Sequence, residues 1–349
     1  MPRRATRVDD FPNRDVLDDI AFGLVKATVL KTAIELEIFT RIAEGHRTVP
    51  ALAHVGGMNE HGTRVLLDAL VFTGLLTKQH SEYKLAPTAE AFLVKGKLSY
   101  YGDAAVGDFA WDARGQLSKV LRTGKPLLAS AYGDAFEPMR AGFAASALVD
   151  AQKQLETVGG LWDKLGLTID GSKPFRVADV ACGSGVLSLS LARRSPTVRV
   201  LAIDRPMVLT YAKHVAESLG MTSQFTFQPG DPLNPELRAE SLDLVLFGNI
   251  TGYLSPEQNI GLFRKAFESL VPNGRIVISA PVADEDHKGP GEVPLTGIEM
   301  LLFSPDGDIY PLAEYRGMLE TVGFSEVTGH KDDWGLIDAL RLAPPAPKQ

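Results

Sequence analysis

Two aspartates and a glycine-rich turn in the second half of the chain have the spacing of a nucleoside-binding site. Asp179 precedes the run Ala181-Cys-Gly183-Ser-Gly185, which we call the glycine turn. A turn of small residues between a strand and a helix lets the backbone approach a ligand closely and directs the helix N-terminus toward it. Asp204 follows at about 20 residues, the distance at which a carboxylate meets the ribose hydroxyls of a bound nucleoside. These residues predict a nucleoside cofactor site.

The acidic residues around the turn favour a cationic ligand over a diphosphate. Asp179 lies inside the predicted strand, where it would repel a phosphate but hold an amino group. Gly230-Asp231, at the end of a later strand, can offer a carboxylate to an adenine amino group. The turn is close to the dinucleotide fingerprint, but Ser188 stands at the third glycine, and the pattern is weak by itself. A P-loop is excluded because the G-K-[ST] run is missing.

The elements that must position these residues alternate between strand and helix from Phe175 onward, which predicts an α/β fold with a doubly wound, Rossmann-like parallel sheet. Ser255 is expected to cap one of the helices, with proline at the first helical position. The patterns predict strands over residues 175–180, 198–204, 225–229, 242–247 and 275–280, and helices after the glycine turn and over residues 206–219, 256–270 and 312–322. A turn is expected at 272–274, and a closing antiparallel hairpin over 326–327 and 335–342.

The first third of the chain is predicted to be a mainly helical domain of the winged-helix type. Its patterns predict a helix over residues 15–44, a helix–turn–helix over 49–55 and 60–75, and a hairpin that joins 75–77 to 83–85. A DNA-reading helix needs basic residues for phosphates and base edges. The second helix of the pair offers few of them and acids as well, so we favour subunit packing over DNA contact; the residues concerned are Arg64 and His61 against Glu60 and Asp68.

The stretch from residue 100 to 162 is predicted to be helical and carries aromatic and methionine side chains among small residues. Taken singly, such side chains are ordinary core. Taken together, just before the cofactor domain, they predict the wall of a pocket for a flat apolar ligand. The candidates are Phe109, Trp111, Tyr132, Phe136, Met139 and Phe143. Residues 166–174 are expected to form the hinge into the cofactor domain.

Composition sets the class of protein. The 349 residues are enough for two domains, and the hydrophobic content of 45% and charged content of 23% are typical of soluble globular proteins. The net charge of -7 argues against general binding to nucleic acid or anionic membranes. We find no apolar run of membrane-spanning length and no secretory signal. The lone Cys182 excludes an internal disulfide and fits a reducing compartment, so we expect a cytoplasmic protein.

With these motifs, residues 15–342 resemble the class I S-adenosylmethionine-dependent methyltransferases, and more narrowly the small-molecule O-methyltransferases with an N-terminal winged-helix dimerisation domain. The most specific pieces are Val177-Ala-Asp-Val-Ala-Cys-Gly-Ser-Gly185, Ala202-Ile-Asp204 and Pro229-Gly-Asp231. The resemblance implies S-adenosylmethionine as cofactor, a small-molecule acceptor and a homodimer formed through the first hundred or so residues. It implies that Asp179, Gly183 and Gly185 hold the methionine portion, Asp204 the ribose and Asp231 the adenine. The implied cofactor set is completed by Ala181, which replaces the family's first glycine, and by Arg205, Gly230, Pro232, Phe247 and Gly248.

The chain departs from this family at the general base. The family carries a His-Asp-Trp run after the fourth strand, and the matching segment here is Asn249-Ile-Thr-Gly252-Tyr-Leu-Ser255, with Gly252 in the place of the histidine. General-base help is worth roughly 100- to 10,000-fold in rate. Either another residue acts, or the acceptor is a neutral amine, an acidic enol or an ionised phenolate and needs no strong base. Correct placement of donor and acceptor then supplies much of the rate.

Several residues are candidates for the acceptor site. Asn249 and Tyr253 could orient an acceptor by hydrogen bonds, although Asn249 could equally cap the loop. Glu299 is an alternative base and Met300 a pocket residue, but a plain helix face accounts for both as well. Asp284-Glu-Asp-His287 has the composition of a metal cluster, yet adjacent loop residues rarely converge on one ion, so we expect a solvated loop and no metal.

The sequence therefore predicts five segments and one leading function. The segments are a flexible N-terminus (1–14), a winged-helix dimerisation domain (15–98), a helical linker that contributes to the acceptor pocket (99–170), a catalytic domain (171–342) and a flexible tail (343–349). The function is methyl transfer from S-adenosylmethionine to an oxygen, nitrogen or carbon of an aromatic or polyketide-like acceptor. Two alternatives stay open: a family member that catalyses a non-methylating reaction, and a cofactor-sensing DNA-binding protein.

Overall fold

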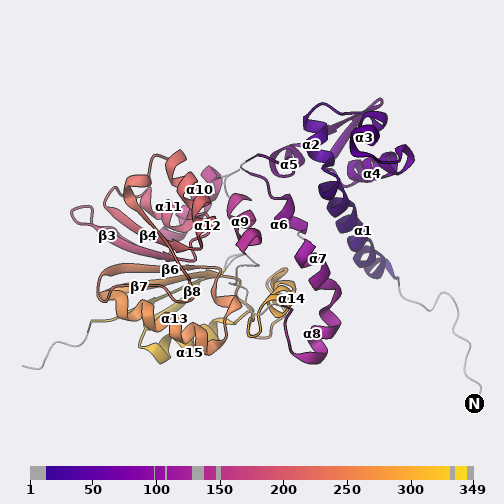
Figure 1. The fold of residues 1–349 in the computed structure, drawn as a ribbon. Coiled ribbons are helices and arrows are strands. Elements are labelled where there is room, and N and C mark those ends of the chain that lie inside the picture. Colours follow the sequence, from indigo (N-terminus) through magenta and orange to yellow (C-terminus); the bar gives the residue numbers. More distant parts are fainter. Residues whose placement is uncertain are drawn as a thin grey trace, which may run out of the picture. The chain divides into compact units, whose positions relative to one another are not determined.

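A computed structural model of the chain describes residues 13–97, 99–106, 108–127, 137–146, 151–330 and 335–343. The chain divides into two compact units, Met1–Val106 and Gly107–Gln349 (Figure 1). The boundaries of the five finer segments expected from the sequence stay predictions, and the two segments expected to be flexible ends lie almost wholly outside the described residues.

The first unit is helical with one small hairpin. The predicted helix over residues 15–44 is wrong in one respect, because Glu37 adopts a left-handed conformation (φ 54°) and splits it in two. The break turns the chain so that Ile38, Phe39 and Ile42 are buried. The helix–turn–helix and the hairpin are present, and their winged-helix assignment stays a prediction. The elements are α1 (Asp15–Glu35), α2 (Ile38–Ala43), α3 (Val49–Gly56), α4 (Glu60–Phe72), β1 (Leu76–Gln79), β2 (Glu82–Leu85), α5 (Pro87–Phe92) and α6 (Gly102–Val106).

Asp68 ties α4 to the hairpin. Its carboxylate accepts hydrogen bonds from Lys78 Nζ at 2.7 Å and from the Tyr83 hydroxyl at 2.8 Å. These two donors hold the pKa of Asp68 below its usual value. Arg64 of the same helix also donates to Asp68, at 3.2 Å. Arg64, one of the two basic residues considered for DNA contact, thus forms a surface ion pair within α4.

The second unit is built on a seven-stranded sheet in the order β5-β4-β3-β6-β7-β9-β8 (Figure 1). The first five of these strands run parallel, and β9 is antiparallel to both β7 and β8. The predicted Rossmann-like sheet with a closing hairpin is confirmed. Its strands are β3 (Phe175–Val180), β4 (Val198–Asp204), β5 (Phe225–Pro229), β6 (Leu242–Gly248), β7 (Leu270–Ala280), β8 (Ser325–His330) and β9 (Gly335–Leu340).

The turn expected at 272–274 lies inside β7. The strand is irregular there, because Asn273 takes a left-handed conformation (φ 63°) and the pairing with β6 shifts register between Leu242 and Leu244. A Cβ added to Gly274 would lie 2.8 Å from the Val271 carbonyl oxygen, so this bend requires glycine. The sequence signal for a turn was real, and the sheet absorbs it as a bulge.

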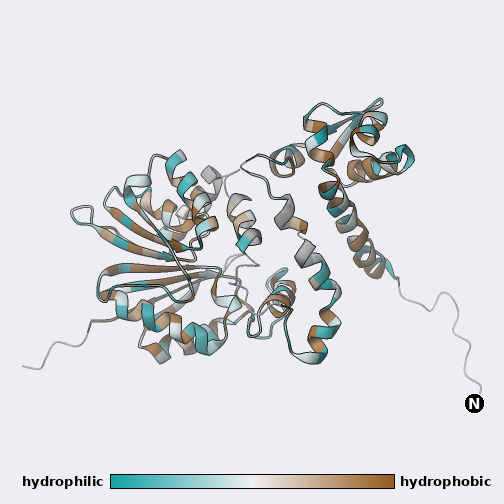
Figure 2. Cartoon of the chain, in the orientation of Figure 1, coloured by the Kyte–Doolittle hydropathy of each residue, from teal (hydrophilic) through white to brown (hydrophobic). Residues whose placement is uncertain are grey.

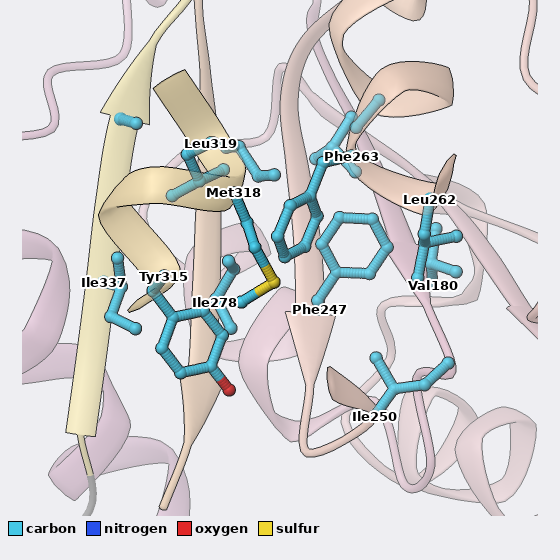
Figure 3. Close-up of a cluster of buried hydrophobic side chains, with 14 of the residues drawn as sticks. Val180, Phe247, Ile250, Leu262, Phe263, Ile278, Tyr315, Met318, Leu319 and Ile337 are labelled. Atoms are coloured by element: carbon cyan, nitrogen blue, oxygen red, sulfur yellow. The ribbon is translucent and has the colours of Figure 1, made fainter. Parts of the chain in front are cut away.

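Helices cover both faces of the sheet. One core joins it to α10, α11 and α12, and the other joins it to α13 and α15. The strands are hydrophobic over most of their length (Figure 2), and in the second core Phe247, Phe263 and Met318 point toward one another between sheet and helices (Figure 3). The helices and short 3-10 turns are α7 (Asp108–Gly115), α8 (Leu117–Thr123), α9 (Glu137–Ser146), α10 (Ala151–Lys164), α11 (Val186–Ala192), α12 (Pro206–Ser218), η3 (Thr222–Gln224), η4 (Thr251–Tyr253), α13 (Pro256–Ser269), α14 (Val293–Phe303) and α15 (Leu312–Val322).

Ser255 caps α13 as expected. Its hydroxyl accepts from the backbone N–H of Gln258, and the Gln258 side chain accepts from the backbone N–H of Ser255, which together form a capping box. Within the described ranges, no helix has both the length and the apolar character needed to cross a bilayer.

Candidate cofactor and acceptor site

The glycine turn leaves β3 in left-handed conformations. Ala181 (φ 58°), Gly183 (φ 58°) and Gly185 (φ 75°) all have positive φ, which glycine adopts without steric cost and alanine at about 1–2 kcal/mol. A Cβ added to Gly183 would meet nothing within 4 Å, so open space adjoins the backbone there. The turn therefore offers the close approach to a ligand that its composition predicts.

Asp179 is the most unusual residue of the site. It is 1% exposed, and its Oδ2 accepts a 2.6 Å hydrogen bond from the Ser188 hydroxyl. Its Oδ1 is buried and has no hydrogen-bond partner among the described residues. Burial raises the pKa of this carboxyl to about 6, with a smaller contribution from the charge of Asp204. A buried acceptor without a donor is costly, and its usual explanation in a native protein is a bound group.

Asp204 lies at the end of β4 beside the turn. Its carboxylate is fully buried and accepts from the backbone N–H groups of Gly183 at 3.0 Å and Arg205 at 2.8 Å. It also accepts from Arg140 Nη2 at 3.0 Å. Asp204 was predictable as a neighbour of the turn, whereas Arg140 was not. The two residues are 64 positions apart, and no local pattern pairs them.

The other predicted cofactor residues cluster at the same edge of the sheet. The Gly230 N–H donates to the Asp204 carbonyl at 3.0 Å, which sets the end of β5 against the end of β4. Asp231 is exposed and accepts from the Leu233 N–H at 3.1 Å, and Pro232 beside it is buried. Arg205 precedes α12. The Phe247 side chain packs in the core, so Phe247 could meet a ligand only through its backbone, whereas Gly248 lines the cavity.

A cavity of about 1380 Å³ joins the glycine turn to the acceptor candidates. This exceeds the roughly 300–1,000 Å³ of a typical small-molecule site, and there is room for two ligands side by side. From the turn it extends past the end of β6 to α14. Its described lining includes Ala181, Gly183, Gly248, Asn249, Tyr253, Glu299, Met300, Arg114 and Arg140.

Asn249 and Tyr253 line the middle of this cavity. Asn249 is left-handed (φ 53°), and its N–H donates to the Ser279 carbonyl at 2.7 Å, so it fixes the loop between β6 and β7 as well as facing the cavity. Burial raises the pKa of Tyr253 to about 12. Its phenol is therefore protonated at neutral pH and can donate a hydrogen bond, but it is not a base there.

Glu299 and Met300 lie on α14 at the far side. Both oxygens of Glu299 accept from Arg114, at 2.8 Å from Nε and 3.2 Å from Nη2. Glu299 could act as a base only after this bidentate pair separates. Met300 is 3% exposed and belongs to a small apolar cluster that also contacts Tyr253.

Gly252 lies in a position where any side chain would be crowded. A Cβ added there would lie 3.2 Å from the Asp308 carbonyl oxygen, 3.6 Å from the Met300 sulfur and 3.8 Å from Ile309. The Asp308 N–H in turn donates to the Gly252 carbonyl at 2.9 Å. Among the described residues that line the cavity, the one histidine is His330, at the end of β8. Its Nε2 lies 2.9 Å from Oδ1 of Asp338.

The predicted aromatic wall is only partly described. Trp111 is half-buried on α7 and is not among the described residues that line the cavity. The side chains of Phe109, Met139 and Phe143 on α7 and α9 lie outside the described parts, as do Tyr132 and Phe136 entirely. Their role in acceptor binding stays a prediction.

The loop with a metal-like composition is held by its own hydrogen bonds. Asp286 accepts from Lys288 Nζ at 2.8 Å, and the His287 N–H donates to the Asp284 carbonyl at 2.8 Å. In the described part of the chain, no three His, Cys, Asp or Glu residues converge as metal ligands would.

Comparison with known proteins places this site in a family. A model described as an O-methyltransferase dimerisation domain matches residues 18–95, and one described as a methyltransferase domain matches residues 177–274. The acetylserotonin O-methyltransferase of Mus musculus is 30% identical over 340 residues, which cover 89% of this chain and 84% of that protein. The chain belongs to the S-adenosylmethionine-dependent O-methyltransferases.

Further comparisons agree with this family assignment. The tetracenomycin polyketide synthesis 8-O-methyl transferase TcmO of Streptomyces glaucescens is 28% identical over 316 residues, covering 90% of this chain and 91% of TcmO. The crystal structure of human N-acetylserotonin methyltransferase in complex with SAM has a TM-score of 0.76 at 22% identity, covering 97% and 100% of the two chains. The family and fold predicted from the sequence are confirmed.

The residues at the glycine turn fit the methyltransferase cofactor. S-adenosylmethionine carries an ammonium group, a sulfonium and two ribose hydroxyls, all of which favour carboxylates over phosphate-binding groups. The partnerless Oδ1 of Asp179 matches an ammonium donor, and the open space at Gly183 admits a ligand against the backbone.

The raised pKa of Asp179 leads to a pH dependence of cofactor binding. Below about 6 the carboxyl is protonated and lacks the negative charge that attracts an ammonium group; above that value it is ionised. Affinity for S-adenosylhomocysteine should therefore rise as pH increases through about 6 and then level off. Asp179→Asn should abolish this rise and weaken binding at the plateau by roughly 10- to 100-fold, the value of a hydrogen bond to a charged group. Isothermal titration calorimetry over a pH series measures both.

Asp163→Asn is the matched control, since Asp163 is an exposed carboxylate on α10. It should keep the wild-type profile. A wild-type affinity that does not change between acidic and neutral pH would contradict the role given to Asp179.

Proposed function

We propose that this methyltransferase moves the methyl group of S-adenosylmethionine onto an ionisable hydroxyl of a small aromatic or polyketide-like acceptor, without an imidazole base at position 252. The observation that carries the proposal is that one cavity joins the glycine turn to Tyr253 and Met300, and that Gly252, next to Tyr253, supplies no imidazole. The relatives support the acceptor class, since TcmO is named for polyketide synthesis and the mouse enzyme for acetylserotonin.

The cofactor roles follow from the donors and acceptors at the turn. Asp179 would accept from the methionine ammonium, and Ala181, Gly183 and Gly185 would lie against the methionine portion. Asp204, at the end of the next strand, would accept from the ribose hydroxyls. The adenine would lie farther along the same edge, against Gly230, Asp231 and Pro232, with the backbone of Arg205, Phe247 and Gly248 completing the pocket.

The acceptor side combines an apolar cluster with polar side chains. Met300 packs with Ala283, Val293 and Ile309 in a cluster that Tyr253 also contacts, and such a surface suits a flat ring. The protonated Tyr253 hydroxyl and the Asn249 amide can donate hydrogen bonds to an acceptor oxygen. These residues orient the acceptor rather than take its proton.

The chemistry then rests on placement. S-adenosylmethionine supplies an electrophilic methyl group, and attack by an oxygen lone pair forms the C–O bond while the C–S electron pair stays on sulfur, giving the methyl ether and S-adenosylhomocysteine. Holding two reactants in line can contribute roughly 7–11 kcal/mol to lowering a barrier. An acceptor that is already ionised needs nothing more from a base.

A transfer assay tests this proposal. With tritiated methyl donor, acidic phenols and enols should be methylated, and phenols of low pKa should react fastest at fixed pH because more of each is ionised. Anilines of matched shape are the control and should react at least tenfold more slowly. Chromatography separates any carbon-methylated products from the methyl ethers. Cofactor binding without transfer to any acceptor would contradict the proposal and favour a family member that catalyses a non-methylating reaction.

Restoring a histidine should not restore a base. Gly252→His must displace the backbone at Asp308, so we expect it to destabilise the protein by about 1–3 kcal/mol and not to raise the transfer rate. Urea unfolding and the tritium assay measure the two effects. Gly317→His is the control, because a Cβ at this α15 position meets nothing within 4 Å. A Gly252→His enzyme that is stable and faster than wild type would contradict the crowding argument.

The same family membership supports a homodimer formed through the first unit. α1 exposes an apolar face of unusual extent, and it is hydrophobic along most of its length (Figure 2). Leu17, Ile20 and Leu24 follow one another at three- and four-residue steps, so they share one side of the helix. The exposed set, with fractional exposures in brackets, is Val16 (71%), Leu17 (69%), Ile20 (69%), Phe22 (61%), Leu24 (65%) and Val25 (52%).

Charge on this face should separate the subunits. The double variant Leu17→Glu/Ile20→Glu should elute as a monomer in size-exclusion chromatography with light scattering, because dimerisation would bury two carboxylates per subunit. Leu121→Glu, at an equally exposed leucine of the second unit, should remain dimeric. If the α1 variant keeps the wild-type mass, the dimer does not form through this face.

A further inference from the structure

Arg140 connects the two halves of the cavity. It lies on α9, lines the cavity, and donates to Asp204 with its Nη2 at 3.0 Å. Its side chain is 14% exposed and the Asp204 side chain 0% exposed, so this is a nearly buried ion pair. Glu137, one turn earlier on α9, accepts from the Met207 N–H of α12 at 2.9 Å. Two polar contacts therefore hold α9 against the β4–α12 junction.

The pair with Arg140 occupies the carboxylate that the ribose needs. A carboxylate offers about four acceptor positions. On Asp204, three donors are present, and those of Gly183 and Arg205 are backbone N–H groups built into the turn and the start of α12. Two further donors from the ribose hydroxyls would exceed the acceptor positions that remain on the Asp204 carboxylate. Of the three, only the Arg140 side chain can move away by rotation, so ribose and Arg140 compete for Asp204.

The alternative position for the Arg140 guanidinium is the acceptor side of the same cavity. Burial raises the pKa of Tyr253, and the charge of Arg140 acts to lower it. Arg140 therefore lies within electrostatic range of the phenol. The other arginine on this wall, Arg114, already gives two donors to Glu299. A guanidinium that leaves Asp204 can therefore present its planar donors to an anion beside Tyr253.

We propose that Arg140 is an acceptor-binding residue controlled by the cofactor: it pairs with Asp204 while the cofactor site is empty, and the cofactor ribose displaces it toward the acceptor, which it binds as a phenolate or enolate. This inference rests on the proposed function. The guanidinium stabilises the anionic form, so the acceptor proton is lost to water at lower pH than in solution. The charge of Arg140 thereby replaces what an imidazole at position 252 would have done. Binding is ordered, with cofactor first.

The test uses para-nitrophenol, whose anion absorbs visible light, with no methyl transfer involved. At fixed pH near the nitrophenol pKa, wild-type protein saturated with S-adenosylhomocysteine should increase the nitrophenolate absorbance. Wild type without S-adenosylhomocysteine should not. An increase of equal size with and without S-adenosylhomocysteine, or none in the saturated complex, overturns the proposal.

Two variants of Arg140 separate charge from shape. Arg140→Gln should lose the absorbance change and weaken nitrophenolate binding by roughly tenfold, whereas Arg140→Lys should retain part of it. Arg140→Gln should also bind S-adenosylhomocysteine about five- to tenfold more tightly, because its ribose no longer displaces an ion pair. Arg122→Gln, an exposed arginine on α8, is the control and should match wild type in both measurements.

These outcomes also distinguish this inference from the proposed function. If S-adenosylhomocysteine fails to bind wild-type protein, the proposed function itself is wrong. If it binds wild type but binds Arg140→Gln more weakly, Arg140 belongs to the cofactor site and the inference alone fails. Thermal unfolding of each variant shows that a loss of binding is not a loss of fold.

Discussion

The hydrogen bond from the Gly183 N–H to the Asp204 carboxylate is the contact on which the rest of the site depends. It joins a left-handed turn after β3 to the end of the neighbouring strand, so that the carboxylates proposed to bind the cofactor ammonium and ribose lie at the same edge of the sheet. The parallel register of β3 and β4 makes this possible, because the carboxyl ends of both strands reach the same edge of the sheet. A change of register by one residue would turn Asp179 to the other face of the sheet.

That arrangement places two carboxylates in a buried edge with few donors. The charge of Asp204 adds to the effect of burial in raising the pKa of Asp179, and Asp179 keeps one oxygen without a partner among the described residues. A sequence selected for stability alone would not keep such a group. In the proposed function, the cofactor ammonium offsets this cost, so the buried carboxylates would favour a cationic nucleoside over a diphosphate.

Local signals in the sequence were sufficient for much of the fold. The bounds of β3 and β4 and the capping box at Ser255 depend on neighbouring residues, and each was predictable. The break at Glu37 was not, because it is set by the burial of Ile38 and Phe39 in a core that forms only in three dimensions. The same holds for the site: the turn and its aspartates are local, whereas the Arg140–Asp204 and Arg114–Glu299 pairs join distant segments by charge alone.

The packing around Gly252 depends on the small size of this residue. The Asp308 backbone occupies the space next to Gly252 and bonds to its carbonyl, and Tyr310 donates from its hydroxyl to the Leu254 carbonyl two residues later. These contacts hold η4 and thus fix where Tyr253 enters the cavity. Because the phenol of Tyr253 stays protonated, neither residue can accept a proton at neutral pH. In the proposed function, ionisation of the acceptor comes from the acceptor's own acidity and from positive charge nearby, so electrostatics rather than proton transfer to position 252 would select substrates.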